Sequence, residues 1–328
     1  MAKATVKAIR LNRTGGPEVM EFVDVPLGDP GPGEALVRHE AIGLNFVEIY
    51  YRSGLYPMEF PTGLGTEGAG IVEAVGPGVT ALKPGDRVGY ASGPRGSYAE
   101  ARIMPADVLV KLPDAISTRQ AAAMMLQGMT AAYLVKRTYP VKAGTTILLH
   151  AAAGGVGLIL AQWAKHLGAR VIGTAGSPEK AALAKAHGSD DVILYRDENI
   201  VSRVKGFTNG TGVHVVYDSV GKDTFEASLD SLRPLGMMVS FGNASGPAPA
   251  ITPLTLGQKG SLFLTRPSLV HHCATRADLE DLSGALFEVV AKGAVKIEVN
   301  QTYPLAEAAQ AHIDLAARRT TGSTILLP

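Results

Sequence analysis

The sequence has a single cysteine, Cys273, among its 328 residues. One cysteine cannot form an intramolecular disulfide, and it cannot supply a cysteine-rich zinc site. Such sparse use of cysteine fits a reducing compartment. The opening segment, MAKATVKAIRLNR, also lacks the apolar core that a secretory signal needs. We therefore expect a cytoplasmic protein without structural disulfides.

The sequence also lacks an excess of charge of either sign. Lys and Arg together number 31, Asp and Glu number 30, and the formal net charge is +1. The absence of long basic or acidic runs argues against nucleic acid or an anionic membrane as the main partner. No uninterrupted apolar stretch approaches the length of a membrane-spanning helix. Composition thus favours a soluble protein whose main partner is neither nucleic acid nor a membrane surface.

At 328 residues the chain is longer than one core usually supports, so two domains are expected. Up to about residue 110, short apolar runs such as KATVKAIRL, GEALVRHEAIGLN and GAGIVEAVGPGV are separated by Gly and Pro. This spacing is typical of a compact, mainly β domain. Ser117 and Gln120 then form a possible capping box, which predicts a helix over AAAMMLQGMTAAYLVKR. We expect this helix to lead into the second domain.

From Thr145 the pattern changes to alternating strand-like and helix-like segments. In order these are TTILLHA, GGVGLILAQWAKHLG, RVIGTAG, SPEKAALAKAHG, DVILY, HVVYDSVG, DTFEASLDSLRPLG and GMMVSFGN. Repeated β–α units predict an α/β fold with a doubly wound parallel sheet of the Rossmann type. SLFLT is then predicted as a strand and ADLEDLSGALFEVVAKG as a helix. KIEV, an Ala-rich helix and STILLP complete the chain.

The strongest local motif is HAAAGGVGLILAQWAK. Ala152, Gly154 and Gly157 occupy the three positions of a G-x-G-x-x-G fingerprint, with alanine at the first. The motif follows a predicted strand and opens a predicted helix. Glycine would let the backbone approach a pyrophosphate, and the helix N-terminus favours its charge. We therefore expect a dinucleotide here, bound also by Gly155 and Val156; the alternative is a tight β–α turn without a ligand.

The end of the next strand indicates which dinucleotide is bound. An NAD site usually has Asp or Glu about twenty residues beyond the first fingerprint position, where it binds the ribose. Here the strand ends in GTAGS, without a carboxylate. Gly176, the hydroxyl of Ser177 and the cation of Lys180 suit a 2′-phosphate, which predicts NADPH. Alternatively, Ser177 only caps the helix that begins at Pro178, and Lys180 is a solvated surface lysine.

The arrangement of a β domain, a Rossmann domain and a short C-terminal return resembles the medium-chain dehydrogenase/reductase superfamily. In its zinc alcohol dehydrogenases, a GHE segment and an upstream cysteine supply catalytic metal ligands. The corresponding residues here are Thr66, in GTEG, and Asn45, in GLN, and the four-cysteine zinc lobe is absent. Neither side chain offers a thiolate or an imidazole. The resemblance therefore implies that no metal is bound.

Segments along nearly the whole chain resemble the zinc-free quinone oxidoreductase family, which includes the zeta-crystallin type. Among them are YYRSGLYP, GTEGAGIVEAVGPGV, YDSVG, FGNASGP, GSLFLTRPSL and AHIDLAARRTTGS. The resemblance implies a discontinuous GroES-like, mainly β catalytic domain of residues 1–127 and 268–328, and a Rossmann domain of residues 128–267. It also implies an NADPH-dependent quinone reductase with its site in the interdomain cleft. A homodimer is expected, with the sheet edge near Ser261 to Thr265 as a candidate contact.

The same resemblance suggests the residues of the site. Arg318 is expected to reach the 2′-phosphate, with Arg319 as the alternative in register. The catalytic candidates near the nicotinamide are Asn45, Tyr50 and Gln127. Further contacts to the cofactor are expected from Thr130, Tyr195, Ser219, Phe241, Gly242, Phe263 and Thr265.

Hydride transfer to a quinone depends chiefly on proximity and orientation in a dry site. We hypothesise that Asn45 or Tyr50 donates a hydrogen bond to a quinone oxygen as negative charge develops on it. Alternatively, Asn45 satisfies buried backbone groups and Tyr50 supplies apolar wall. Two other functions remain open: NADPH-dependent reduction of the double bond of an enone or enal, and a non-catalytic role as a crystallin or an RNA-binding protein.

Overall fold

The structure is a computed structural model that describes residues 5–328. It divides into two compact units. Unit 1 comprises Met1–Met129, Cys273–Ala291 and Ile297–Pro328, and unit 2 comprises Thr130–His272 and Lys292–Lys296. The domain boundaries suggested by the sequence, after residues 127 and 267, stay a prediction. The first two residues of the predicted strand KATVKAIRL, Lys3 and Ala4, lie outside the described residues.

Unit 1 consists mainly of β-strands. Its strands are β1 (Thr5–Leu11), β2 (Glu21–Pro26), β3 (Glu34–Leu44), β4 (Thr62–Gly63), β5 (Gly68–Val75), β6 (Arg87–Tyr90), β7 (Ala101–Pro105), β8 (Val110–Lys111), β15 (Val299–Pro304) and β16 (Ser323–Leu327). One sheet has the strand order β2–β1–β4. The other has the order β15–β16–β3–β5–β6–β8, and β7 pairs with β3.

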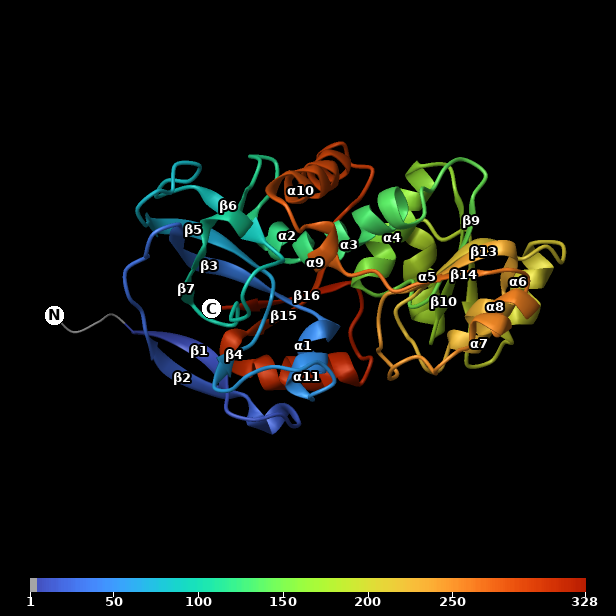
Figure 1. The fold of residues 1–328 in the computed structure, drawn as a ribbon, viewed down its shortest axis with the longest axis horizontal. Helices are drawn as coiled ribbons and strands as arrows, with labels where there is room; N and C mark the ends of the chain where they lie inside the picture. Colours follow the sequence, from blue (N-terminus) through green and yellow to red (C-terminus); the bar gives the residue numbers. More distant parts are fainter. Residues whose placement is uncertain (1–4) are drawn as a thin grey trace. The chain divides into compact units, whose positions relative to one another are not determined.

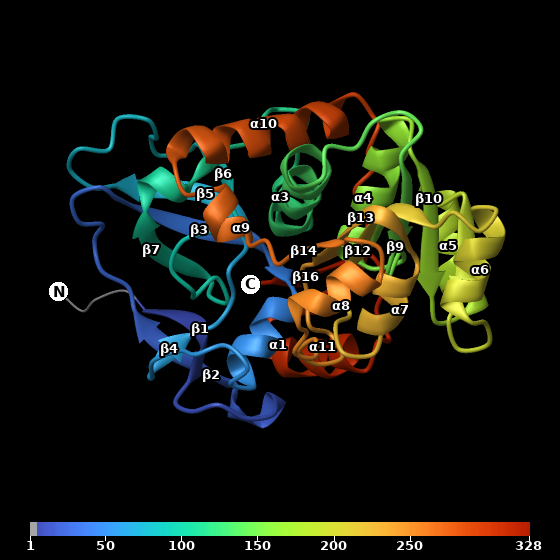
Figure 2. The ribbon, with the colours of Figure 1, turned by 45° about the vertical axis from the view of Figure 1, so that its right-hand side comes forward.

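The C-terminal strand completes the sheet that begins in the N-terminal part of the chain. β16 pairs antiparallel with β3, with Thr324 opposite Leu44. Along β3, buried and accessible residues alternate before a fully buried end, as expected for a strand with one face on a core. That core includes Ile9, Leu64 and Leu326. Two helices of this unit, α1 (Phe46–Arg52) and α11 (Ala308–Ala316), lie side by side (Figures 1 and 2).

The predicted capping box is confirmed, but the long helix after it is broken. Gln120 N donates to Ser117 Oγ at 3.2 Å, and α2 spans Thr118–Ala122. Ala123 N and Met124 N then bond to carbonyls only three residues back, which tightens the turn. α3 restarts at Met125 (Met125–Tyr133) and continues into a π-helical turn, Leu134–Thr138. The break leaves the first amides of α3 without helical partners.

Unit 2 contains one parallel sheet. Its strands are β9 (Thr146–Leu149), β10 (Arg170–Ala175), β11 (Asp191–Leu194), β12 (Val213–Asp218), β13 (Leu232–Ser240) and β14 (Phe263–Thr265). Every adjacent pair is parallel, and the order is β11–β10–β9–β12–β13–β14. Counted from β9, this is the doubly wound order 3-2-1-4-5-6, which confirms the predicted Rossmann sheet. The order reverses between β9 and β12, where such sheets bind ligands.

Unit 2 also contains the helices α4 (Gly155–His166), α5 (Pro178–Ala186), α6 (Ile200–Phe207), α7 (Phe225–Asp230), α8 (Pro253–Gln258) and α9 (Leu269–His272). α5 packs on β10 and β11, and α7 lies beside α8 in both views (Figures 1 and 2). Leu148, Ile172 and Val216 of the strands form one core with Val204 of α6 and Phe225 of α7.

Several elements differ from the prediction. α1, α6 and α8 lie outside the predicted helices, and β2 outside the predicted strands. Of the tail segment KIEV, only the last residue, Val299, belongs to a strand, β15. The backbone N–H and C=O of Lys296 bond instead to the side-chain amide of Gln162, at 2.9 and 3.1 Å. Helix α10 (Arg276–Ala291) agrees with the predicted ADLEDLSGALFEVVAKG helix.

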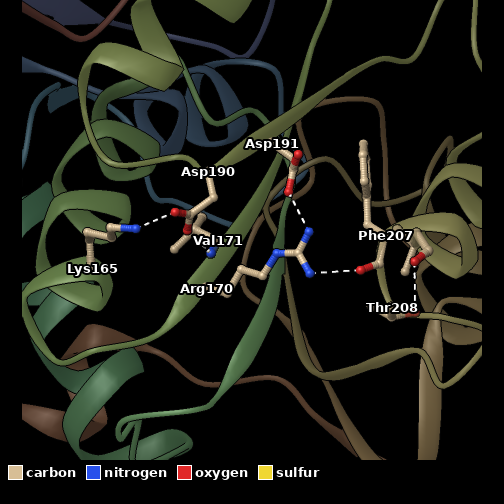
Figure 3. A network of polar contacts seen from close by, with 8 residues as sticks. Lys165, Arg170, Val171, Asp190, Asp191, Phe207 and Thr208 are labelled. Atoms are coloured by element: carbon tan, nitrogen blue, oxygen red, sulfur yellow. Dashed lines mark hydrogen bonds and ion pairs between the residues drawn. The ribbon is translucent and has the colours of Figure 1, made fainter.

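A polar network lies at the amino-terminal ends of β10 and β11 (Figure 3). Arg170 binds the carboxylate of Asp191 at 2.8 Å and the carbonyl of Phe207 at 2.7 Å. Asp190 pairs with Lys165 and accepts a bond from Val171 N at 2.9 Å. These groups are partly exposed, so each pair adds little stability. The network ties two strands together at the edge opposite their carboxyl ends.

Within residues 5–328, no helix combines the length and the apolar character needed to cross a membrane.

Candidate functional site

The fingerprint loop of unit 2 ends in the N-terminus of α4. Gly154 occupies the N-cap position in an extended conformation, and no side chain caps the helix. The first amides of the helix, at Gly155, Val156 and Gly157, therefore point out without intrahelical partners. A Cβ at Gly157 would lie 2.4 Å from Ala151 O and 2.8 Å from Ala152 C. Only glycine allows this close turn, which suits the binding of an anion.

Alanine at the first fingerprint position is accommodated by the neighbouring strand. Ala152 is fully buried, and its N–H donates to Thr174 O at 3.0 Å. A Cβ on Gly173 of β10 would lie 2.7 Å from the Cβ of Ala152. The left-handed residue of the loop is Ala151, with φ 53°, and its N–H bonds Thr174 Oγ1 at 3.3 Å. The loop thus keeps its tight turn without the first glycine.

A buried polar network lies beneath this loop. His150 Nδ1 contacts Thr174 Oγ1 at 3.2 Å, and His150 Nε2 contacts Ser228 Oγ at 3.0 Å. Ser228 Oγ donates to Asp218 Oδ2 at 2.8 Å. Burial lowers the pKa of His150, and the nearby Asp218 opposes this shift. The imidazole therefore joins the ends of β9 and β10 to α7 in its neutral form.

Asp218 organises the turn after β12. Its carboxylate is fully buried and accepts bonds from Val220 N at 2.7 Å, Gly221 N at 3.0 Å and Thr224 Oγ1 at 2.7 Å. Besides these, it accepts the bond from Ser228 described above. A buried carboxylate needs this many donors to offset its lost hydration. The turn that carries Ser219, a predicted cofactor residue, is consequently held rigidly.

Three predicted site residues meet at the ends of β12 and β13. Phe241 N donates to Asp218 O at 2.8 Å. A Cβ on Gly242 would lie 2.4 Å from Ser219 O, so the two loops touch through backbone. Ser219, Phe241 and Gly242 therefore lie together at the carboxyl edge of the sheet. This is the edge that also carries the fingerprint loop.

The predicted 2′-phosphate residues lie together after β10. Ser177 Oγ accepts a bond from Lys180 N at 3.3 Å and so caps α5, which is the capping role weighed from the sequence. A Cβ on Gly176 would lie 2.6 Å from the Tyr195 hydroxyl. One carboxylate was missed: Glu179 in the first turn of α5 bonds Ser177, which lowers the pKa of Glu179. The strand end itself carries no acid.

The other predicted cofactor residues are more scattered. Phe263, whose exposed fraction is 55%, and Thr265 lie on β14, which pairs with β13. Thr130 is buried in α3. Arg318 belongs to unit 1 and has φ 58°, while the alternative, Arg319, pairs with Asp314.

In unit 1 the three predicted catalytic residues include two members of a buried chain of hydrogen bonds. Asn45, directly before α1, donates from Nδ2 to Glu67 Oε2 at 2.7 Å. Gln127 Nε2 of α3 donates to Asn45 Oδ1 at 3.0 Å. Ser323 Oγ of β16 donates to Gln127 Oε1 at 2.7 Å. We name Glu67, Asn45, Gln127 and Ser323 the amide chain; it links residues 196 apart in sequence.

Two carboxyl groups are fully buried beside this chain. Glu67 Oε1 accepts a bond from Leu126 N at 2.8 Å, one of the amides freed by the break before α3. Glu48 accepts bonds from Asn45 N at 2.8 Å and from Thr66 Oγ1 at 2.7 Å. Burial raises the pKa of Glu67 to about 8 and that of Glu48 to about 7, and each opposing hydrogen bond lowers it less. Glu48 further raises the pKa of Glu67.

These acids and Ser323 were missed from the sequence. Glu48 stands among apolar residues in FVEIYY, which is an available signal of burial, whereas Glu67 in GTEG has no such signal. A Cβ on Gly43 would lie 2.1 Å from Glu67 Oε2, so the glycine makes room for the carboxyl group. Nothing in the sequence brings Ser323 to Gln127, because that contact depends on the pairing of β16 with β3.

The third catalytic candidate, Tyr50, is buried. Its exposed fraction is 8%, and its ring packs edge-on against Tyr56 with centroids 5.3 Å apart. Both polar atoms of the Asn45 side chain bond other side chains, and Asn45 also forms a capping box with Glu48 at the start of α1. The amide nitrogen carries two hydrogens, and among the described residues its one partner is Glu67. A second donor is thus left at Asn45.

Known proteins match this chain along almost its entire length. Residues 31–114 match the alcohol dehydrogenase GroES-like domain, and residues 155–287 match the zinc-binding dehydrogenase family. A quinone oxidoreductase of Pseudomonas aeruginosa is 55% identical over 323 residues, covering 98% of this chain and 99% of the relative. The chain belongs to the quinone oxidoreductase family of the medium-chain dehydrogenase/reductases. The predicted GroES-like and Rossmann domains are therefore both confirmed.

Solved structures agree with this membership of the quinone oxidoreductase family. The Escherichia coli quinone oxidoreductase complexed with NADPH has a TM-score of 0.96 and 49% identity, covering 98% of this chain and 100% of that one. A further relative, a 2-haloacrylate reductase from a Burkholderia species, is 44% identical over 330 residues and covers 98% of this chain and 99% of its own. The relatives of this chain thus include proteins named for two kinds of acceptor.

Proposed function

We propose that this protein is an NADPH-dependent quinone reductase. The observation that carries the proposal is the similarity over 98% of the chain to quinone oxidoreductases, one of them solved with NADPH. The fingerprint loop supports it independently. NADPH, when bound, supplies the hydride; a hydride and one proton convert a quinone to a hydroquinone.

The residues of unit 2 fit a dinucleotide. The turn at Gly157 leaves no room for a side chain, and the uncapped N-terminus of α4 offers amides to a pyrophosphate. We propose that Gly154, Gly155, Val156 and Gly157 hold the pyrophosphate, as predicted. Gly176, Ser177, Lys180 and Tyr195, at the end of β10 and beyond, are then proposed for the 2′-phosphate and the adenosine. Ala152, Thr130, Ser219, Phe241, Gly242, Phe263, Thr265 and Arg318 stay proposals as cofactor residues.

In unit 1 we propose that Asn45 orients the quinone. Its second N–H is available to a carbonyl oxygen that gains negative charge as the hydride arrives. Glu67 and Gln127 fix the amide on both sides, so the donor does not have to reorganise. Tyr50 supplies apolar wall that excludes water.

We further propose that the reaction needs no metal, although one matching family is described as zinc-binding. The chemistry of the donor set carries this proposal. Asn45 and Thr66 are poor zinc ligands. Both side chains already form hydrogen bonds: Thr66 Oγ1 donates to Glu48, and Asn45 bonds Glu67 and Gln127. Elemental analysis of the purified protein, paired with activity after chelation, tests this. A stoichiometric zinc ion whose removal abolishes turnover would contradict it.

The test of the main proposal is the oxidation of NADPH and NADH by the chelated protein, followed at the nicotinamide absorbance. The acceptors are 1,4-benzoquinone, 9,10-phenanthrenequinone and an enone. We expect rapid quinone reduction with a preference for NADPH. Asn45→Ala should lower turnover, with Tyr50→Phe as its partner variant. Binding of NADPH without turnover of any acceptor would instead favour a non-catalytic role.

A second candidate function is the reduction of an activated carbon–carbon double bond. The relative named 2-haloacrylate reductase, 44% identical over nearly the whole chain, favours it. A donor at Asn45 would serve the carbonyl of an enone or enal as well as that of a quinone. Turnover of 2-chloroacrylate or an enone in preference to both quinones would move the assignment to this activity.

We also propose a cytoplasmic homodimer that does not depend on nucleic acid. The edge strand β14 has its outer side unpaired in the sheet order, and Phe263 on it is exposed. The near-zero net charge gives little attraction to RNA. Sedimentation of the wild type against Phe263→Glu tests the dimer. Salt-sensitive retention on RNA that NADPH competes away would revive the nucleic-acid role.

A further inference from the structure

A cavity in unit 1, away from the amide chain, is lined by three arginines. Arg10 lies on β1, Arg102 on β7, and Arg95 in the segment before Gly96. The cavity has a volume of about 250 Å³. A water occupies about 30 Å³ in the liquid, so the space suits a group of several heavy atoms. We name these three residues and their cavity the arginine pocket.

Two glycines let these guanidinium groups converge. Gly63 pairs with Arg10 across β1 and β4, and a Cβ on Gly63 would lie 3.3 Å from Arg10 Nη1 and 2.9 Å from Gly96 Cα. A Cβ on Gly96 would in turn lie 3.7 Å from Arg102 Cζ. A side chain at Gly63 would crowd Arg10 and Gly96, and one at Gly96 would contact Arg102. Both glycines line the pocket with backbone.

The arginines lack the acidic partners that such a cluster normally has. In the described part of the chain, no carboxylate lines the pocket, and none forms an ion pair with these three side chains. Glu21 stands opposite Arg10 in the β1–β2 register, but its carboxylate accepts bonds from Asn12 at 3.3 Å. Three like charges that share a cavity repel each other unless an anion joins them.

Some of the donors are buried and unused. Arg95 Nε and Arg102 Nη1 are inaccessible to solvent and have no hydrogen-bond partner within residues 5–328. Arg102 Nη2 donates to Arg95 O at 3.2 Å, and the Arg95 guanidinium lies 4.6 Å from the centroid of the Tyr51 ring. These contacts hold the groups in place without satisfying them. A ligand in the cavity would not reach these two nitrogens, so they show only that the guanidinium groups are incompletely paired.

We propose that the arginine pocket binds a small phosphorylated molecule through its phosphate group. A guanidinium pairs bidentately with phosphate oxygens, and three of them match a dianion that no acidic side chain opposes. The inference does not rest on the proposed reductase activity, because none of the three arginines belongs to the amide chain or to the fingerprint loop.

Calorimetric titration tests the proposal, with saturating NADPH present to fill the nucleotide site. The probes are inorganic phosphate, glycerol 3-phosphate and citrate. We expect one binding site for each phosphate compound. Arg102→Gln and Arg10→Gln should each weaken it about tenfold to a hundredfold, as the loss of one charge-assisted bond predicts. Arg38→Gln, which removes a cation paired with Glu73, is the matched control and should leave binding unchanged.

Folding of the variants is checked by their melting temperatures. Arg102→Lys keeps the charge but loses the bidentate fork, so it should fold like the wild type and still weaken phosphate binding. Phosphate should also raise the melting temperature of the wild type more than that of Arg102→Lys. Equal binding by all variants, binding of citrate alone, or no binding at tens of millimolar phosphate would each overturn the proposal.

Discussion

The two units form their candidate sites in opposite ways. In unit 2 the fingerprint loop is contiguous, and its shape is set by backbone: Gly157 has room for no side chain, and Gly242 touches Ser219 through main-chain atoms. In unit 1 the amide chain is made of side chains from four separate segments. The fingerprint loop therefore depends on having no side-chain atoms at its glycines. The amide chain depends on the matching of hydrogen-bond donors with acceptors.

The sharpest test of this contrast is Gly157→Ala. The added methyl group would meet backbone atoms at 2.4 and 2.8 Å, which flexible side chains cannot relieve. Overpacking of this kind costs up to about 3 kcal/mol, so we expect NADPH affinity to fall by on the order of a hundredfold. Fluorescence titration of NADPH measures it. Gly206→Ala, on α6 with open space around it, is the control and should bind normally. An unchanged NADPH affinity in Gly157→Ala would show that the shape of the fingerprint loop does not depend on the missing side chain.

The corresponding test in unit 1 is Gln127→Leu. It keeps the volume but leaves Asn45 Oδ1 and Ser323 Oγ without their partners. We expect a loss of about 1–3 kcal/mol in the free energy of unfolding for each group left unsatisfied. Quinone turnover should fall while NADPH affinity holds. Urea unfolding and steady-state kinetics measure the two effects.

A double-mutant cycle with Ser323→Ala then measures the link between Gln127 and Ser323. We expect a coupling free energy of about 0.5–1.5 kcal/mol. Strictly additive effects would mean that the amide chain does not act as a unit.

The buried acids give unit 1 a pH dependence of its own. The pKa of Glu67 is raised to about 8, so between its unfolded value of 4.5 and about pH 8 the unfolded state binds fewer protons than the folded state. Stability must therefore fall as pH rises through this window, by up to about 1.4 kcal/mol per pH unit. Glu48, raised to about 7, acts in the same direction.

Glu67→Gln removes one of these titrations. The free energy of unfolding of the variant minus that of the wild type should be larger at pH 8 than at pH 5. Urea unfolding of both proteins at the two pH values measures this difference. A difference between the two proteins that is independent of pH would show that Glu67 is ionised throughout.

The smallest effects are expected at the end of β10. Ser177→Ala should cost about 0.5–2 kcal/mol in stability, because it removes the cap of α5. If the hydroxyl also binds the 2′-phosphate, the preference for NADPH over NADH falls. Glu179→Gln should raise that preference, because it removes the one carboxylate that bonds Ser177. Competition of the two cofactors in steady-state kinetics measures both, and an unchanged ratio in both variants would leave Ser177 as a cap only.

The contrast between the units also explains what the sequence could predict. The order of strands and helices in unit 2 followed from periodicity, and the fingerprint from three spaced positions, because each is local. The pairing of β16 with β3 is not local, so the bond between Gln127 and Ser323 was out of reach. Asn45 and Gln127 came from the family resemblance, not from the pattern.

Breaks in helices were equally hard to foresee. The residues from Ala121 to Gln127 are all good helix formers, and only tertiary structure stops α2 at Ala122. That stop frees the amide of Leu126, which Glu67 then binds. The burial of Glu67 and the break between α2 and α3 therefore depend on each other, and neither can be inferred from the sequence without the other.

Ala152 and Gly173 also have a consequence for how this chain can change. The methyl group that replaces the first fingerprint glycine occupies the space that a methyl group on β10 would need. The two positions share room for one side chain, so their substitutions are not independent. A variant that enlarges Gly173 would become tolerable only if Ala152 returned to glycine, and related chains should exchange the two residues as a pair.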